Sequence, residues 1–386
     1  MRACDQQVGI YIHWPFCLNK CPYCDFNSHV RDKIDQDHFL KTYYKEIDNF
    51  KTLLPNAKTA SIFFGGGTPS LMEPRLVEGL IHKVLETWPA ENNPEITLEA
   101  NPSSVEANRF KGYREAGVNR VSLGIQALRN DDLKSLGRWH NVREAKEALE
   151  IAKKTFSRVS FDLIYARPNQ SFENWRLELK EALLMAEGHL SLYQLTIEDG
   201  TAFAQAHKKG RIKLPEENLA RDLYNLTQDM CEENGLPAYE VSNHARPGQE
   251  SQHNLIYWKG FGYLGLGPGA HGRLPTKEGM VATALIRKPE GWLNKVEETG
   301  TGLIEQQLLS SEDRAVENLM MGIRLNKGID RQEYREINGL NLEDIISFEA
   351  VNDLGKKGFL DLSQTHLRAT KKGMPLLNSI LKVLLV

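Results

Sequence analysis

Apolar and polar residues alternate along the first 235 positions in two repeating patterns. Short runs of mostly apolar residues are typical of strands buried on both faces of a sheet. The stretches between them place apolar residues three or four positions apart, which predicts amphipathic helices. The expected strands are 9–14, 60–64, 95–100, 120–126, 159–165 and 190–197. The expected helices are 37–54, a segment that ends near 88, 105–116, 131–136, 142–154, 172–186 and 216–234.

This alternation predicts parallel βαβ units with right-handed crossovers, and hence an α/β fold. The pattern does not distinguish an open sheet from one that curls into a barrel. We assign residues 1–235 to this core domain.

The rest of the chain differs in composition. Residues 236–305 are rich in Gly and aromatic side chains, and we expect them to complete the core and its site. Residues 306–386 predict a smaller helical, winged-helix-like domain. Its expected elements are helices at 312–325, 331–338 and 341–357, short strands at 358–362 and 367–369, and an amphipathic closing helix at 374–386.

Composition narrows the class of protein. The chain has 386 residues, of which 41% are hydrophobic and 26% charged, and its formal net charge is −3. This charge argues against a broadly basic surface, so no nucleic-acid partner is expected. No run approaches the roughly 20 apolar residues that a membrane helix needs. The first residues also lack the basic and apolar pattern of a signal peptide, so we expect a cytoplasmic protein.

Three cysteines lie close together directly after the first expected strand. Cys17, Cys21 and Cys24 form the pattern C-x3-C-x2-C. Thiolates suit zinc or an iron–sulfur cluster. A structural zinc site usually needs four protein ligands in two separated pairs, and here there is no second pair. Three thiolates on a four-iron cluster would leave one iron open to a small molecule, although zinc stays open as an alternative.

Polar residues and glycines follow the later strands at their carboxyl ends. Ligands bind at this edge in parallel α/β folds. A charged side chain within a buried strand is costly unless it is paired or functional. A tight turn for the glycines, and salt bridges or caps for the polar residues, remain alternatives. The candidates are Gly66, Gly67, Thr68, Glu99, Gln126, Arg138 and Asp162.

The cysteine motif, with Tyr23 just before its third cysteine, resembles that of the radical S-adenosylmethionine (radical SAM) superfamily. The resemblance implies a [4Fe–4S] cluster whose open iron chelates S-adenosyl-L-methionine. It also implies that the glycine segment contacts the methionine amino group. Glu99, Gln126, Arg138 and Asp162 would then contact the carboxylate, ribose or adenine. Tyr11 and Tyr23 match positions that line the same pocket.

Longer stretches resemble the oxygen-independent coproporphyrinogen III oxidase family over most of the chain. They are IYIHWPFCLNKCPYCDFNS, FFGGGTPS, NRVSLGIQ, FDLIY, YEVSNHARPG, HNLIYW and YLGLGPGAHG. The resemblance implies a partial (β/α)6 barrel followed by a small helical domain. The family includes decarboxylases, which convert coproporphyrinogen III to protoporphyrinogen IX, and haem chaperones, which bind haem and deliver it to acceptor proteins.

Three features favour the haem chaperone over the decarboxylase, which stays the alternative. Phe26 occupies the position of the decarboxylase's fourth cysteine, and only 16 residues precede Cys17. His253 begins the HNLIYW motif that is linked with haem binding in the chaperones. Imidazole is a common axial ligand of haem iron, although a structural histidine would also fit. No catalytic residue is assigned.

The family resemblance further implies respiratory proteins as haem acceptors, transient peripheral contact with a membrane, and a homodimer. One stretch departs from the family pattern. Where relatives carry Gly-Leu-Pro-Gly-Gln after the fifth strand, this chain has Ala166-Arg167-Pro168-Asn169-Gln170. We therefore expect a turn that is built differently, with the charge of Arg167 near the mouth of the barrel.

Overall fold

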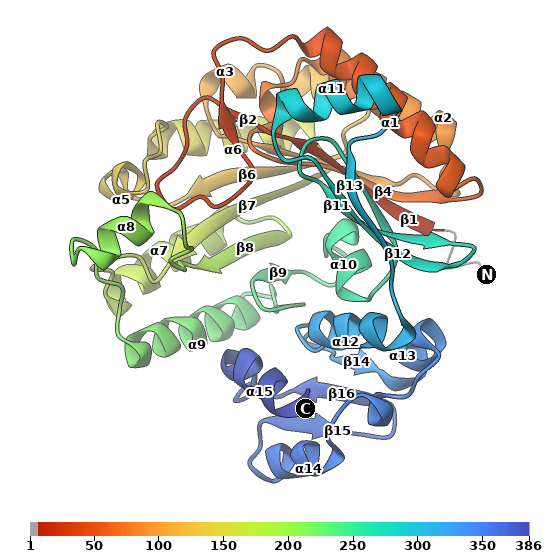
Figure 1. The fold of residues 1–386 in the computed structure, drawn as a ribbon. Coiled ribbons are helices and arrows are strands. Elements are labelled where there is room, and N and C mark those ends of the chain that lie inside the picture. Colours follow the sequence, from red (N-terminus) through yellow and green to blue (C-terminus); the bar gives the residue numbers. More distant parts are fainter. Residues whose placement is uncertain (1–6, 386) are drawn as a thin grey trace.

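The computed structural model describes residues 7–385 and contains the six predicted parallel strands. Each pairs with the next in chain order, so that they form one curved sheet (Figure 1). The prediction of a parallel α/β core is therefore confirmed. The six strands are β1 (Gln7–Trp14), β4 (Lys58–Gly66), β5 (Glu95–Ala100), β6 (Arg120–Gln126), β7 (Arg158–Tyr165) and β8 (His189–Gln194).

Amphipathic helices connect these strands and bury their apolar faces against the sheet. Ser171 and Asn141 cap two of them by accepting hydrogen bonds from the first helical turn, as polar N-cap residues do. The helices are α1 (Gln36–Leu53), α2 (Pro74–Thr87), α3 (Ser104–Ala107), α4 (Phe110–Glu115), α5 (Asn130–Ser135), α6 (Val142–Thr155), α7 (Phe172–Met185), α8 (Ala202–Lys208) and α9 (Glu217–Glu233).

The single helix expected at 105–116 was wrong, since α3 and α4 are separate. The break falls at Asn108 and Arg109. Asn is a poor helix former, and the Arg109 guanidinium donates to the carbonyl oxygen of Ser70 on a neighbouring turn.

The sheet is larger than the sequence predicted and has eleven strands within residues 7–385. β10 (Tyr263–Leu266) pairs in parallel with the free side of β1, and an antiparallel meander continues from it. The further strands are β9 (Asn243–Ala245), β11 (His271–Thr276), β12 (Gly279–Leu285) and β13 (Leu303–Leu308). β13 forms one edge of the sheet, and all but its first residue are exposed. The helices of this region are α10 (Gln252–Trp258) and α11 (Pro289–Thr299).

The last part of the chain lies beside the barrel as helices packed on a small sheet (Figure 1). The sheet has the order β14-β16-β15. The expected helix 341–357 was wrong in its first half, where a 3-10 turn, Leu342–Asp344, precedes α14. The elements are α12 (Ser311–Gly322), β14 (Ile329–Asp330), α13 (Arg331–Asn338), α14 (Phe348–Lys356), β15 (Leu360–Leu362), β16 (His366–Ala369) and α15 (Leu377–Leu384).

The closing helix is amphipathic as predicted, because α15 buries Leu377, Ile380, Leu381 and Leu384 along one side. Within residues 7–385, no helix is long and apolar enough to cross a membrane. Residues 1–6 lie outside the described residues. They are the start of the predicted core domain and of the region searched for a signal peptide. Val386, the last residue of the predicted closing segment, does so too.

Candidate functional site

A cavity of about 530 Å³ opens at the carboxyl ends of the parallel strands. The structure brings most of the predicted site residues together here, although they come from six separate segments. Those lining the cavity are Cys17, Cys21, Tyr23, Cys24, Gly66, Gly67, Thr68, Glu99, Gln126, Arg138 and Asp162. Tyr11 and His253 do not line it.

The cysteine loop is held to the barrel by donors that point at sulfur. Thr68 Oγ1 lies 3.4 Å from Cys17 Sγ, and Arg138 Nη1 lies 3.3 Å from Cys21 Sγ. Burial raises the pKa of the Cys17 and Cys24 thiols, so a bound cation is needed to favour their thiolates. Among residues 7–385, no three His, Cys, Asp or Glu side chains are grouped closely enough to hold a metal ion.

The glycine segment at the end of β4 lies against the backbone that leads into the cysteine loop, because the N–H groups of Gly67 and Thr68 donate to the carbonyl oxygens of Trp14 and Phe16. Gly66 has φ of 112°, a conformation that other residues rarely adopt. A Cβ atom added at Gly67 would lie 2.6 Å from the carbonyl oxygen of Phe16. Glycine is therefore required here for the close approach of two backbone segments, and not only for a tight turn.

Gln126 and Asp162 form one polar wall of the cavity. The backbone N–H and the side-chain amide of Gln126 both donate to the Asp162 carboxylate, at 3.1 Å and 2.9 Å. Gln126 has φ of 62°, which strains a non-glycine residue. Its Oε1 and the Nε of Arg138 are both buried, and neither has a hydrogen-bond partner among the described residues. Unpaired buried polar atoms are rare in native proteins, so this wall fits a polar ligand such as S-adenosylmethionine.

Glu99 adds a second carboxyl group to the cavity. Burial, and to a smaller extent the charge of Asp162, raises the pKa of Glu99 to about 7, although the Gly66 N–H opposes the shift. Burial also raises the pKa of Asp162, against the hydrogen bonds from Gln126. Among the described residues neither carboxyl group forms an ion pair, so both are available to the hydroxyl or ammonium groups of a ligand.

The sequence analysis missed Asn101, which links two of the sulfur donors. Its Oδ1 accepts from Arg138 Nη2 at 2.5 Å, and its Nδ2 donates to Thr68 Oγ1 at 3.5 Å. The signal was available, since Asn101 directly follows β5 at the edge where the other candidates lie.

His253 lies deeper in the barrel, near its amino end. Its ring is stacked on Phe63, with ring centroids 5.0 Å apart, and the Tyr11 ring lies 6.4 Å away. Ser61 Oγ lies 2.8 Å from His253 Nδ1. The Tyr11 hydroxyl instead bonds His13 Nδ1 at 3.0 Å, two residues further along β1. The structure therefore separates these two predicted residues from the others.

The divergent turn after β7 has the positive φ angles that are typical of glycine, although it contains no glycine. Ala166 and Asn169 occupy the two glycine positions and have φ of 55° and 60°. Arg167 does not line the cavity mouth, where we had expected its charge. It is 2% exposed and bonds Glu178 of α7 and Asp132 of α5, at 2.5 Å and 2.8 Å. The turn thus fastens two helices on the outside of the barrel.

Comparison with known proteins agrees with this architecture. Residues 11–182 match the radical SAM superfamily, and residues 309–376 match the HemN C-terminal domain. The solved structure of coproporphyrinogen III oxidase (HemN) from Escherichia coli has a TM-score of 0.82 at 21% identity. This similarity covers 99% of the present chain and 91% of the other. The fold and the cysteine loop therefore define a radical SAM protein, a class that implies a [4Fe–4S] cluster and S-adenosylmethionine.

Relatives narrow the class further. Heme chaperone HemW of Haemophilus influenzae is 36% identical over 98% of both chains. The mitochondrial radical S-adenosyl methionine domain-containing protein 1 of Danio rerio is 36% identical over 98% of this chain and 87% of its own length. HemW of Escherichia coli is 35% identical over 98% of both chains. The chain belongs to this HemW family of radical SAM proteins.

Proposed function

We propose that the protein is a haem chaperone that binds haem and delivers it to respiratory acceptor proteins. The observation that carries this proposal is the 33–36% identity, along almost the whole chain, to proteins named heme chaperone HemW. Phe26 supports it, because this side chain is 59% exposed at the place of the decarboxylase's fourth cysteine. A cytoplasmic location, transient membrane contact and a homodimer belong to the same proposal.

The residues proposed to bind cofactors lie at two levels of the barrel. The cluster and S-adenosylmethionine would bind at the carboxyl end, and haem near the amino end. Cys17, Cys21 and Cys24 would hold a cluster, which supplies single electrons. Arg138 and Thr68 orient two of the sulfurs. The polar wall would orient S-adenosylmethionine. The other cavity residues proposed to contact it are Tyr23, Gly66, Gly67 and Glu99, beside Gln126 and Asp162 of the wall.

His253 has the properties of a haem ligand at the lower level. Burial lowers its pKa to about 3, so the imidazole is neutral and keeps a lone pair at physiological pH. Ser61 engages Nδ1, which leaves Nε2 without a hydrogen-bond partner among residues 7–385. A histidine held through one ring nitrogen presents the other to a metal in a fixed tautomer. Iron of haem is the metal that we assign to His253.

Haem titration of the cluster-loaded protein tests this assignment. We expect saturable one-to-one binding in the wild type, at least tenfold weaker binding in His253→Ala, and a smaller loss in Ser61→Ala. His271→Ala, at an exposed histidine of β11, is the matched control and should bind as the wild type does. Unchanged affinity in a folded His253→Ala protein would remove His253 from the site, and the absence of binding in the wild type would refute the chaperone.

Coproporphyrinogen decarboxylation remains the second candidate, favoured by the HemN-like fold over 99% of the chain. The measurement is mass spectrometry of porphyrinogen products after anaerobic incubation with reductant and S-adenosylmethionine. We expect no decarboxylated product while an active decarboxylase run in parallel forms it. Product over many turnovers would replace the chaperone proposal with an enzymatic one.

A further inference from the structure

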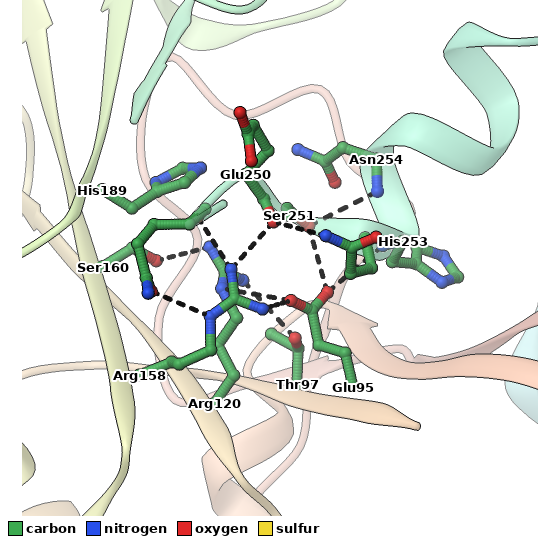
Figure 2. A network of polar contacts seen from close by, with 12 residues as sticks. Glu95, Thr97, Arg120, Arg158, Ser160, His189, Glu250, Ser251, His253 and Asn254 are labelled. Atoms are coloured by element: carbon green, nitrogen blue, oxygen red, sulfur yellow. Dashed lines mark hydrogen bonds and ion pairs between the residues drawn. The ribbon is translucent and has the colours of Figure 1, made fainter. Parts of the chain in front are cut away.

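The amino end of the barrel contains a compact network of charges that the proposed function does not use. Glu95 of β5 accepts from Arg158 Nη1 at 2.5 Å and lies 3.9 Å from Arg120 Nε (Figure 2). The remaining bonds of the two arginines go to uncharged oxygens. Arg120 donates to Thr97 and Ser160, and Arg158 donates to Gln249 and to the carbonyl oxygen of Glu250. One carboxylate thus faces two guanidinium groups.

Such an imbalance of charge is costly away from bulk water. The Arg120 and Glu95 side chains are 4% and 3% exposed, and Arg158 is 22% exposed. Burial, together with the charge of Arg120, lowers the pKa of Arg158 despite its bonds to Glu95. Buried charges are normally paired, so the network has room for one more negative charge.

A cavity of about 200 Å³ adjoins both arginines. Arg246 also lines it and has no side-chain hydrogen bond or ion pair among residues 7–385. Ser157, Gln249 and the acidic Glu187 complete an exposed rim, so the cavity is open to solvent. Counting Glu95, the cavity carries three positive and two negative side chains.

His189 supplies an unused polar atom in the same cavity. It is 4% exposed, and its Nε2 bonds the Tyr239 hydroxyl at 3.0 Å, whereas its buried Nδ1 has no partner in the part of the chain that the structure describes. Burial, followed by the charges of Arg120 and Arg158, lowers the pKa of His189 well below its ordinary value. The ring is therefore neutral. If the Tyr239 hydroxyl donates to Nε2, the Nδ1 position carries the proton and acts as a donor.

We infer that this cavity binds a small tetrahedral oxyanion of the phosphate class, held by Arg120, Arg158 and Arg246 with His189 as a neutral donor. Guanidinium groups form charge-assisted bonds to such oxygens. The volume suits a single phosphate group rather than a nucleotide. The site lies at the end of the barrel opposite the cysteine loop, and Glu95 connects its arginines to the backbone N–H of His253.

Isothermal titration calorimetry of the full-length, cluster-loaded protein with inorganic phosphate tests this inference, at constant ionic strength in chloride. We expect one saturable site, competition by sulfate, and affinity reduced about tenfold in Arg246→Gln, which removes one charge-assisted contact. Arg246 has no partner to lose, so this variant should fold. His189→Phe, with its fold checked by circular dichroism, should also weaken binding.

Arg211→Gln is the matched control, because Arg211 is likewise exposed and without a side-chain partner among the described residues, and lies outside this cavity. It should bind phosphate as the wild type does. The inference is overturned if the wild type shows no saturable heat up to millimolar phosphate, if Arg246→Gln binds equally well, or if Arg211→Gln weakens binding to the same extent. None of these outcomes depends on the haem proposal.

Discussion

The two ends of the barrel use the same kind of residue in opposite ways. Glu95 and Glu99 lie four residues apart on β5, and alternation along a strand directs both into the barrel. Glu95, at the amino end, is bonded by Arg158, Ser251 and the backbone of His253. Glu99, at the carboxyl end, has no arginine within hydrogen-bonding distance among the described residues, and its pKa is raised to about 7. Glu95 is thus held in the fold beside an excess of arginine, for which we propose an anion, whereas the unpaired Glu99 faces the cavity where a polar ligand is expected.

The largest expected effect is the loss of the cluster when a thiol of the cysteine loop, at the carboxyl end of the barrel, is removed. Cys17→Ala leaves two thiolates, too few to retain four irons. Iron analysis after anaerobic reconstitution should fall from about four atoms per chain to near zero. Cys231→Ala, at a buried cysteine of α9, should retain full iron. Equal iron in both variants would contradict the assignment.

The next largest effect is a difference in the free energy of unfolding between variants of Glu95 and Glu99. Glu95→Gln leaves two arginines without their carboxylate, and breaking a buried pair in this way costs about 3–5 kcal/mol. Glu99→Gln removes no ion pair and spares the fold the cost of ionising a buried carboxyl group, so it should not destabilise the protein at neutral pH. Urea unfolding of both variants gives the comparison. Similar losses in the two would show that the ends do not differ as described.

A smaller effect is the pH dependence that Glu99 contributes in the protein without ligands. Its pKa in the folded state is about 7, above the ordinary value of 4.5, so the folded state binds the proton more tightly. Stability from this group is full below about pH 4.5 and declines as the pH rises to about 7. Since other buried carboxyls also titrate, the quantity to measure is the difference between wild type and Glu99→Gln.

That difference should change by about 1–3 kcal/mol between pH 5 and pH 7.5, in the direction that favours the variant at high pH. Glu46 has a pKa raised to about 7 in another part of the core and is present in both proteins, so its contribution cancels. Parallel curves for the two proteins would mean that Glu99 is hydrated and unshifted.

The smallest effect concerns backbone strain in the turn after β7. Ala166 has φ of 55°, and a left-handed conformation costs a non-glycine residue about 1–2 kcal/mol. Because glycine also loses more entropy on folding, Ala166→Gly should stabilise the protein by a net value of about 0.5–1 kcal/mol. Ala152→Gly, within α6, should instead destabilise it by about 1 kcal/mol. A loss at both positions would show that the turn is not strained.

Local patterns predicted the six parallel strands because each is a continuous apolar run flanked by turns. β5 and β6 were placed at their observed bounds for this reason. The strands from β9 to β13 were missed, although β12 and β13 are at least as long as β5. Of the others, β9 and β10 are short, and β10 joins β1 from more than 240 residues away. Pairing over such a distance leaves no periodicity in a single segment.

The same limit applies to the site. Residues that end strands could be grouped at one edge of the sheet because topology alone brings them together. The sequence could not show that His253 lies near the other end, since that depends on how α10 enters the barrel. Nor could it show that Arg167 is paired with Glu178, eleven residues further on, instead of facing the mouth.

The exposed edge strand β13 has a practical consequence for working with the protein. Within residues 7–385 no strand covers its outer side, and Ile304 and Leu308 are 53% and 51% exposed there. Edges of this kind recruit strands from neighbouring molecules. We therefore expect storage at high concentration to favour self-association through this edge, and dilution to reduce it.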